Sequence, residues 1–293
     1  MRSPCFTKRT ERATAHRQPS IYGEASMNVP SIDYAVLDRP EVVNHLFYPR
    51  REWQMEKSFS SSEDILIPVE RDVAVGARFH AAGKAALNIL FFHGNGEIVA
   101  DYDDLAALYN RMNVNFLPVD YRGYGRSTGS PTVSAMMKDC HVIFEFVRNR
   151  LKDDGYTGPL VIMGRSLGSA SALELAAAHK DAIDGLIIES GFAYAGPLLE
   201  LMGVDARAIG FKEEEGFRNV DKIRAFNKPT LIIHAERDHI IPFSDGQALF
   251  EASPAEGKFF LKIPRANHND IFALGLTEYM AAIRAFTEGL KAR

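Results

Sequence analysis

Six short apolar runs between residues 87 and 263 constrain the fold of this chain more than any other feature of its sequence. Each run is rich in Val, Ile, Leu and Phe, and none shows the polar alternation of a strand with one face in water. Segments with apolar residues three and four positions apart separate the runs, which is typical of helices. The sequence therefore predicts an α/β fold, with helices on both faces of a mostly parallel sheet.

Two further strands are expected ahead of these runs, because residues 65–69 and 73–80 are joined by a short polar turn that is typical of a hairpin. The sheet is then expected to contain about eight strands. The six parallel strands are expected at residues 87–92, 114–119, 160–163, 185–188, 230–234 and 258–263. Helices are expected at residues 97–111, 133–152, 166–179, 245–252 and 270–290.

The charge distribution divides the chain into a short extension and one domain. Residues 1–26 contain five basic and two acidic side chains, but no apolar stretch of the kind found in secretory signals. They are expected to form a disordered extension, with a targeting segment or sequence upstream of a start at Met27 as the alternatives. Residues 27–293 are expected to be a single domain around one large core. Within it, residues 191–228 are expected to form a short lid or insertion, because they exceed the length of an ordinary βα connection.

Composition argues against several classes of function. The net charge is −4, so the chain lacks the basic excess of a nucleic-acid-binding protein. Its apolar runs have strand length, far below the roughly 18 residues of a membrane-spanning helix. Its two cysteines, Cys5 and Cys140, are too few for a disulfide framework, which favours a cytoplasmic location. The sequence contains no metal-binding motif, and neither a metal nor another cofactor is expected.

The motif G-R-S-L-G at residues 164–168 is the strongest local signal of chemistry. It follows an expected strand and opens an expected helix. A sharp strand-to-helix turn needs small residues on both sides and lifts the serine hydroxyl above the sheet. The helix N-terminus also favours developing negative charge. Ser166 is therefore the candidate nucleophile, and an ordinary serine N-cap is the alternative.

A serine nucleophile needs a base, which a carboxylate in turn orients. If the chain order is serine, acid, histidine, the best base is His268, in a polar loop after the last strand; a solvated loop imidazole is the alternative. The candidate acid is Asp238, because it follows a buried strand at the carboxyl end, where the active-site groups of open α/β sheets collect. Glu189 is the runner-up, although a structural carboxylate is its favoured interpretation, and Glu236 is a near neighbour of Asp238.

Acyl transfer also needs N–H donors for an oxyanion. Leu167 follows the candidate nucleophile, so its N–H is expected to be one donor. The loop H-G-N-G at residues 93–96 follows an early strand, and the second donor is assigned to the N–H of Asn95, with Gly96 as the alternative. A simple helix-entry turn is the other interpretation of this loop. The Gly-rich loop at residues 120–127 lacks the Lys-Ser/Thr of a phosphate-binding loop and is expected to be a rigid border of the site.

Taken in order, these motifs resemble those of the α/β-hydrolase superfamily over about residues 60–290. The loops at 93–96 and 120–127 and the H-N-D sequence at 268–270 are similar to minimal-lid serine hydrolases, which include mammalian membrane-associated protein depalmitoylases and many uncharacterised bacterial relatives. The resemblance implies a cofactor-free acyl-enzyme mechanism. The roles it implies are nucleophile for Ser166, base for His268, orienting acid for Asp238, and oxyanion donors for Asn95 and Leu167.

Two positions depart from the pattern of these relatives. Asn267 stands before His268, where the family usually has glycine. The N-terminal region contains only Cys5, whereas the depalmitoylases carry several cysteines there for membrane attachment. The resemblance therefore implies neither their membrane attachment nor their substrate for this chain.

The sequence as a whole predicts a serine hydrolase that cleaves carboxylic ester or thioester bonds in a small-molecule or acyl-group substrate. A serine peptidase or amidase is one alternative, and a non-catalytic binding protein on a hydrolase fold is another. A binding protein is expected to lack a member of the triad, and all three candidates are present here. The sequence predicts neither acyl-chain specificity nor oligomeric state.

Overall fold

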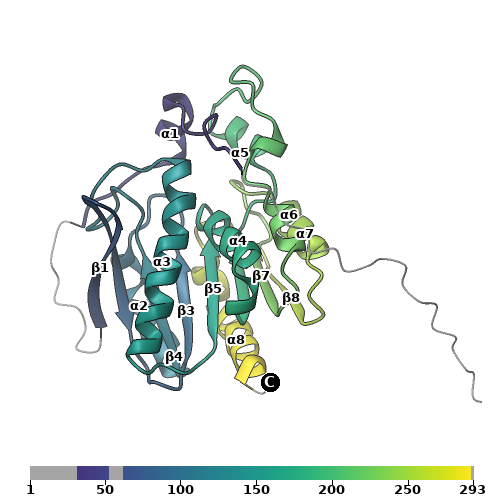
Figure 1. Cartoon of the computed structure of the whole chain (residues 1–293). Coiled ribbons are helices and arrows are strands. Elements are labelled where there is room, and N and C mark those ends of the chain that lie inside the picture. Colours follow the sequence, from purple (N-terminus) through teal and green to yellow (C-terminus); the bar gives the residue numbers. More distant parts are fainter. Residues whose placement is uncertain (1–31, 53–61, 292–293) are drawn as a thin grey trace, which may run out of the picture.

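One eight-stranded sheet organises the part of the chain that the computed structural model describes, residues 32–52 and 62–291 (Figure 1). Its strands are β1 Ser62–Glu70, β2 Val73–His80, β3 Leu87–Phe92, β4 Val114–Val119, β5 Leu160–Arg165, β6 Gly185–Glu189, β7 Thr230–Ala235 and β8 Lys258–Ile263. Their order across the sheet is β1-β2-β4-β3-β5-β6-β7-β8. Strand β2 pairs antiparallel with both neighbours, and every other pair is parallel.

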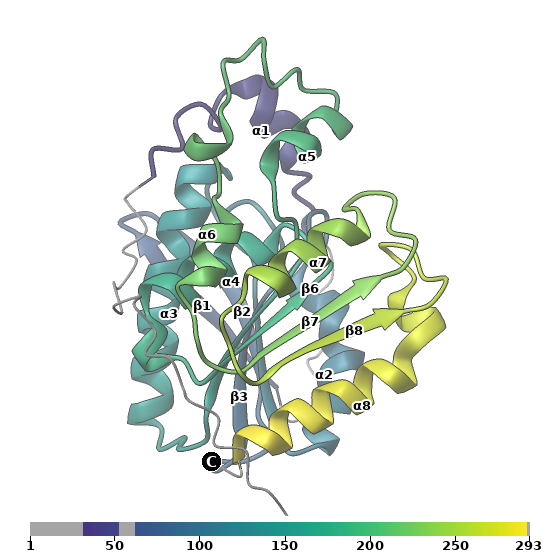
Figure 2. The same ribbon diagram turned by 90° about the vertical axis from the view of Figure 1, so that its right-hand side faces the viewer.

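Helices cover both faces of this sheet (Figure 2). Two helices pack on one face, α2 Asp103–Arg111 and α8 Ile271–Lys291. The other face carries α3 Val133–Asp153, α4 Gly168–Ala178, α6 Asn219–Arg224 and α7 Phe243–Ala252. Every residue of β3, β4, β5, β6 and β7 is buried, which explains why these strands lack polar alternation in the sequence. The predicted α/β fold with a mostly parallel sheet of eight strands is confirmed.

Two expected elements differ from the structure in detail. The helix expected at residues 97–111 is a 3-10 turn, η1 Val99–Tyr102, followed by α2. The carboxylate of Asp101 accepts the N–H of Ile98 at 3.0 Å, which stabilises this separate first turn. Strand β8 lies at the sheet edge and is largely half-buried or exposed, although its apolar run resembles that of a central strand.

Short helices lie above the carboxyl ends of the parallel strands. Residues 191–228 form α5 Ala195–Leu201, the turn η3 Glu213–Glu215 and α6. Helix α1, Pro40–Leu46, lies beside α5 although it comes from the other end of the described chain (Figures 1 and 2). The Arg39 guanidinium joins the two regions by donating to the carbonyl of Ile209 at 2.9 Å.

The expected extension, residues 1–26, lies outside the described residues. The division of the chain into an extension and one domain therefore stays a prediction, as does the lid role of residues 191–228.

Candidate active site

Ser166 lies in the sharp turn between β5 and α4. Its φ angle is +50°, in the left-handed region that residues with a side chain rarely adopt. A Cβ atom on Gly164 would lie 2.3 Å from the carbonyl oxygen of Gly168, and one on Gly168 would lie 2.1 Å from that of Phe92. Both glycines are needed because backbone approaches backbone here, and the turn holds Ser166 at the end of the sheet.

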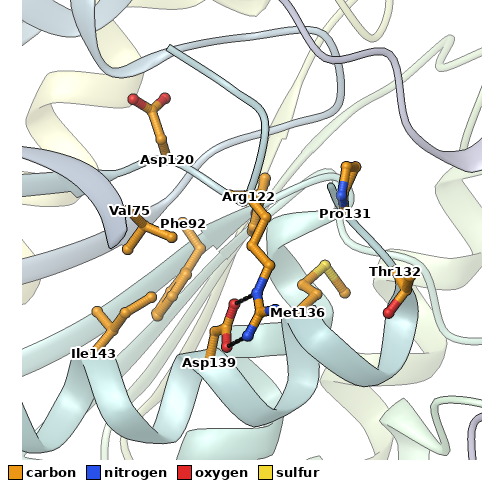
Figure 3. Close-up of a pocket in the computed structure, with 10 residues that line it drawn as sticks. Val75, Phe92, Asp120, Arg122, Pro131, Thr132, Met136, Asp139 and Ile143 are labelled. Atoms are coloured by element: carbon orange, nitrogen blue, oxygen red, sulfur yellow. Dashed lines mark hydrogen bonds and ion pairs between the residues drawn. The ribbon is translucent and has the colours of Figure 1, made fainter. Parts of the chain in front are cut away.

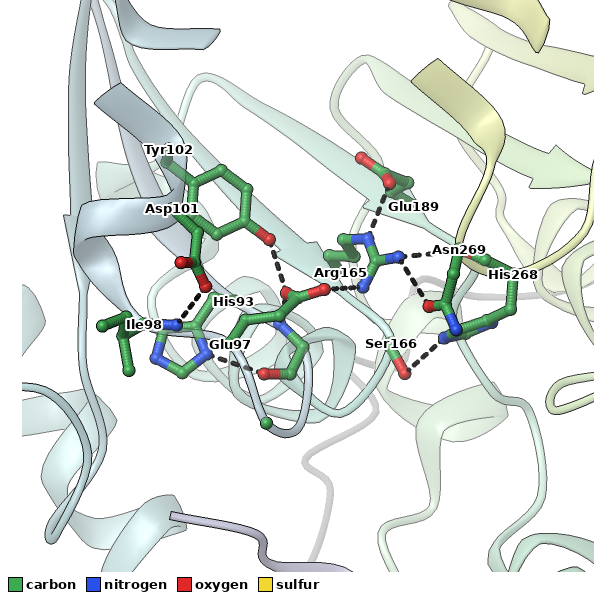
Figure 4. Close-up of polar contacts among 12 residues, drawn as sticks. His93, Glu97, Ile98, Asp101, Tyr102, Arg165, Ser166, Glu189, His268 and Asn269 are labelled. Carbon is green, nitrogen blue, oxygen red and sulfur yellow. Dashed lines mark hydrogen bonds and ion pairs between the residues drawn. The ribbon is translucent and has the colours of Figure 1, made fainter. Parts of the chain in front are cut away.

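Ser166, His268 and Asp238 come together in one hydrogen-bonded chain. The His268 Nε2 atom lies 3.0 Å from Ser166 Oγ (Figure 4), and its Nδ1 atom lies 2.7 Å from Asp238 Oδ2. The exposed fractions of Ser166 and His268 are only 8% and 3%. This arrangement can move a proton from the hydroxyl to the imidazole while the carboxylate orients the ring.

The Asp238 carboxylate is held on both of its oxygens. Its Oδ1 atom accepts the N–H groups of Ile240 and Ile241 at 3.0 and 2.8 Å, and the side chain is inaccessible to solvent. Burial raises the pKa of Asp238, but the hydrogen bond and charge of His268 and the two N–H groups outweigh it, so the pKa lies below its ordinary value. The residue is therefore ionised at neutral pH.

The two alternative acids lie elsewhere. Glu189 is buried and binds Arg165 Nε at 3.0 Å and the Tyr279 hydroxyl at 2.8 Å. Glu236 pairs with Lys262 at 2.7 Å. Neither carboxylate contacts His268, and the pairing of Glu189 agrees with its interpretation as a structural carboxylate.

Asn267, the residue before His268, has no positive φ angle, so this backbone position does not need glycine. Its side-chain oxygen accepts the N–H of His268 at 2.8 Å and the N–H of His239 at 3.2 Å. The departure from the family pattern therefore provides a bracing contact within the loop.

Asn95 lies in the loop after β3, and its side chain is fixed by two donors. Its Oδ1 atom accepts the Tyr124 hydroxyl at 2.7 Å and the N–H of Tyr48 at 2.9 Å. Within the described ranges, the backbone N–H groups of Asn95 and Leu167 have no backbone or side-chain acceptor. Both groups are therefore available to an external acceptor.

Residues 47–52, which we call the N-terminal strap, run along this loop. Besides the Tyr48 contact, Arg50 Nε donates to the carbonyl of Gly96 at 3.2 Å and pairs with Asp101 through its terminal nitrogen. The Arg50 carbonyl accepts the N–H of Gly125 at 2.8 Å. No local pattern in the sequence predicts the strap, because its partners lie roughly 45 or more residues away.

The Gly-rich loop at residues 120–127 supports the loop that contains Asn95. Asp120 Oδ1 lies 3.3 Å from His93 Nε2, and Arg122 forms two hydrogen bonds with Asp139, at 2.6 and 2.8 Å (Figure 3). The cavity beneath this loop measures about 10 Å³, room for about one water molecule. The loop is therefore a packed border and not a ligand cradle.

Two properties of the described residues bear on other functions. Residues 32–52 and 62–291 contain no group of three or more His, Cys, Asp or Glu side chains placed to hold a metal ion. In the same ranges no helix combines the length and apolar character required to traverse a bilayer.

Comparisons with known proteins agree with these observations. A family model described as "Serine aminopeptidase, S33" matches residues 83–208. Solved structures that resemble this one include a ferulic-acid complex of Est1E from Butyrivibrio proteoclasticus, with a TM-score of 0.65 and 17% identity over 78% of this chain and 100% of that one. The Pyrococcus furiosus esterase Pf2001 gives a TM-score of 0.66 and 17% identity over 82% and 98% of the two chains. These likenesses support the fold.

Sequence relatives are closer. Escherichia coli protein YfhR, itself named as uncharacterised, is 28% identical over 66% of both chains. Human α/β hydrolase domain-containing protein 17B is 31% identical over 215 residues, which are 69% of this chain and 67% of that protein. With this relative and the architecture described above, the chain belongs to the α/β-hydrolase superfamily, as its motifs predict.

Proposed function

We propose that this hydrolase cleaves carboxylic ester or thioester bonds through an acyl-enzyme formed on Ser166. The observation that carries the proposal is the hydrogen-bonded chain from Ser166 through His268 to Asp238 at a strained strand-to-helix turn. The names of the resembling structures, an esterase and a monoacylglycerol lipase among them, favour ester bonds.

In the first half of the proposed reaction, His268 Nε2 takes the proton of Ser166 as Oγ attacks the carbonyl carbon. The N–H groups of Asn95 and Leu167 bind the resulting oxyanion. The intermediate collapses, the carbonyl re-forms, and the alcohol or thiol leaves with the proton held by His268. The ionised Asp238 stabilises the imidazolium throughout, and its two N–H partners keep it in place.

In the second half, the acyl-enzyme reacts with water. His268 Nε2 removes a proton from the water molecule as the water oxygen attacks the carbonyl carbon of the acyl-enzyme. The N–H groups of Asn95 and Leu167 bind the second oxyanion. Return of the proton to Ser166 Oγ releases the carboxylic acid. Neither half-reaction needs a cofactor.

A serine peptidase or amidase is the second candidate, because the matching family model is described as a serine aminopeptidase. The same residues would act on an amide, where His268 must protonate the leaving amine. A non-catalytic binding protein is disfavoured, since the three side chains are in hydrogen-bonding contact. The cytoplasmic location expected from the sequence stays a prediction.

The test combines active-site labelling with turnover. A fluorophosphonate probe is applied to the wild type, Ser166→Ala and His268→Ala, and p-nitrophenyl acetate, p-nitrophenyl octanoate, an acyl-thioester and an aminoacyl-p-nitroanilide are assayed in parallel. Ser169→Ala is the matched control, because Ser169 is also buried at the start of α4 but its hydroxyl forms none of the hydrogen bonds of the triad.

We expect labelling and ester turnover in the wild type and the control, and neither in the other two variants. Faster cleavage of the anilide than of the esters would favour the peptidase instead. A folded wild type that neither reacts with the probe nor turns over any substrate would contradict the proposal.

A further inference from the structure

Arg165, the residue before the candidate nucleophile, is buried and surrounded by partners on two sides (Figure 4). On one side it forms an ion pair with Glu97. On the other its guanidinium donates to the carbonyl oxygen of His268 at 2.8 Å and lies 3.5 Å from Asn269 Oδ1. Its Nε atom binds Glu189 at 3.0 Å. One guanidinium therefore contacts the loops before and after the nucleophile at the same time.

Glu97 connects this guanidinium to the loop that contains Asn95. Its Oε2 atom accepts the N–H of Gly94 at 2.6 Å and the Tyr102 hydroxyl at 2.5 Å. Burial raises the pKa of Glu97, but the charge of Arg165 and the Tyr102 hydroxyl outweigh it and hold the pKa below its ordinary value. Gly94 also lies directly against the guanidinium, since a Cβ there would be 2.7 Å from an Arg165 terminal nitrogen. The loop that contains Asn95 is thus packed on Arg165.

Glu189 anchors the guanidinium from the sheet. It closes β6, is 1% exposed, and its second oxygen accepts the Tyr279 hydroxyl from α8 at 2.8 Å. Two carboxylates and one backbone carbonyl thus surround a single planar cation. Arginine suits this place because its N–H groups point in fixed directions, whereas a lysine ammonium is a point charge.

We propose that Arg165 is a positioning residue that sets the distance between the oxyanion donors and the base of the reaction. This inference rests on the proposed function. Arg165 acts through its neighbours: it holds Gly94, next to Asn95, through Glu97, and it holds His268 by the backbone carbonyl. The oxyanion donors and the base both act on the transition state. A change at Arg165 should therefore alter kcat more than it alters substrate binding.

The test compares Arg165→Lys with Arg78→Lys. Arg78 is another buried arginine, on β2, with the carboxylates of Asp64 and Asp103 each at 2.7 Å. It also lies 3.3 Å from Glu52, the last residue of the N-terminal strap, but it contacts neither of the two loops. We expect both variants to lose thermal stability. Only Arg165→Lys should lower kcat, by about tenfold to a hundredfold, with KM within about twofold, because a small displacement of reacting groups has that effect.

Glu97→Gln provides a second variant in case Arg165→Lys does not fold. It keeps an acceptor for Gly94 but removes the ion pair, and we expect a smaller decrease in kcat. A further readout is the inhibition constant of a phenylboronic acid, which forms a tetrahedral adduct with serine. That constant should rise in step with the fall in kcat/KM for both site variants and stay unchanged in Arg78→Lys.

The outcomes separate this inference from the proposed function. If the wild type reacts with the fluorophosphonate and hydrolyses esters, but Arg165→Lys and Glu97→Gln retain its kcat and boronate affinity, the inference is wrong and the proposed function stands. The inference is also wrong if Arg78→Lys lowers kcat as much as Arg165→Lys. If the folded wild type neither reacts nor turns over, the proposed function fails and this inference fails with it.

Discussion

Ser166 adopts a backbone conformation that costs free energy, and its two flanking glycines make that conformation possible. A left-handed φ angle at a residue with a side chain costs on the order of 1–3 kcal/mol, which the surrounding structure must supply. The close packing of Gly168 against the carbonyl of Phe92 contributes part of the stabilising free energy that offsets this cost. The turn is therefore stable only as long as no side chain enters it.

We predict that Gly168→Ala destabilises the protein by about 1–3 kcal/mol or more and reduces ester turnover, because its Cβ would overlap a backbone carbonyl. Gly289→Ala is the control, since Gly289 is exposed in α8 and no atom lies within 4 Å of the added carbon. That substitution should stabilise the protein by about 0.5–1 kcal/mol. Urea unfolding followed by fluorescence measures both, and equal stability of the two variants would contradict the prediction.

The sequence reveals some site residues and hides others for physical reasons. Ser166 is visible because its turn requires glycines at fixed spacing, and His268 and Asp238 follow from chain order and strand ends. The contacts of Arg165 are not visible, because position two of the motif is sterically free and its partners Glu97 and His268 lie 68 and 103 residues away. A sequence motif therefore reveals the steric needs of its own turn, but not contacts with residues far away in the sequence.

At the scale of helices, a buried charge cluster joins α4 to α6 and to α3. The Lys222 ammonium is 1% exposed and lies 2.6 Å from Glu174, and it also donates to the Tyr34 hydroxyl at 3.1 Å. The second oxygen of Glu174 lies 3.2 Å from His141. These contacts connect the helix that follows Ser166 to the segment at residues 191–228.

We predict that Glu174→Gln destabilises the protein by about 3–5 kcal/mol at neutral pH, because it leaves the Lys222 charge buried without a counter-ion. Glu145→Gln is the control, since Glu145 pairs with Arg148 on the surface of α3 and such pairs contribute about 0–1 kcal/mol. Chemical unfolding of the two variants gives both values. A loss below 1 kcal/mol in Glu174→Gln would show that Lys222 is neutral or hydrated.

The same pair makes stability depend on pH in acid. Burial raises the pKa of Glu174, but the hydrogen bond from His141 and the charge of Lys222 outweigh it and lower the pKa from 4.5 to about 2. A carboxyl whose pKa falls on folding stabilises the protein above its unfolded pKa, and this contribution disappears as pH falls through the folded value. Between pH 4.5 and about 2, stability should therefore decline less steeply in Glu174→Gln than in the wild type.

Buried strands and long helices are predictable from sequence, and short helices are not. The central strands form unbroken apolar runs, whereas α3 and α8, with 21 residues each, are long enough for a helical period to emerge. Helices α1 and α5 have seven residues each, about two turns, which is too few for a helical period to be seen. The start of α5 is instead held from outside the helix by Glu213, whose carboxylate accepts the N–H groups of Ala195 and Gly196 at 2.7 and 2.9 Å.

At the scale of the molecule, the N-terminal strap completes a site whose other residues come from the middle and end of the fold. The strap holds the Asn95 side chain through the N–H of Tyr48. The candidate oxyanion loop thus depends on a segment that precedes the sheet in the sequence.

We predict that Asn95→Ala lowers kcat by about tenfold although its backbone N–H remains, because the loop loses its contacts with Tyr48 and Tyr124. Tyr48→Ala is the control: its side chain is 57% exposed and its backbone N–H still donates to Asn95. Steady-state kinetics with p-nitrophenyl acetate compares them. Equal kcat in Asn95→Ala and wild type would mean that the strap does not position the loop.

The order of the site residues along the chain has a consequence for protein synthesis. Ser166 precedes His268 by 102 residues, which is roughly 5–20 s of translation at about 5–20 residues per second. The nascent chain therefore emerges from the ribosome with its candidate nucleophile but without its candidate base, and Arg165 does not yet have the His268 carbonyl to bind. The proposed ester hydrolysis would begin only when the loop that contains His268 docks. The time at which activity appears on the ribosome would therefore show when β8, at the edge of the sheet, and the loop after it have folded.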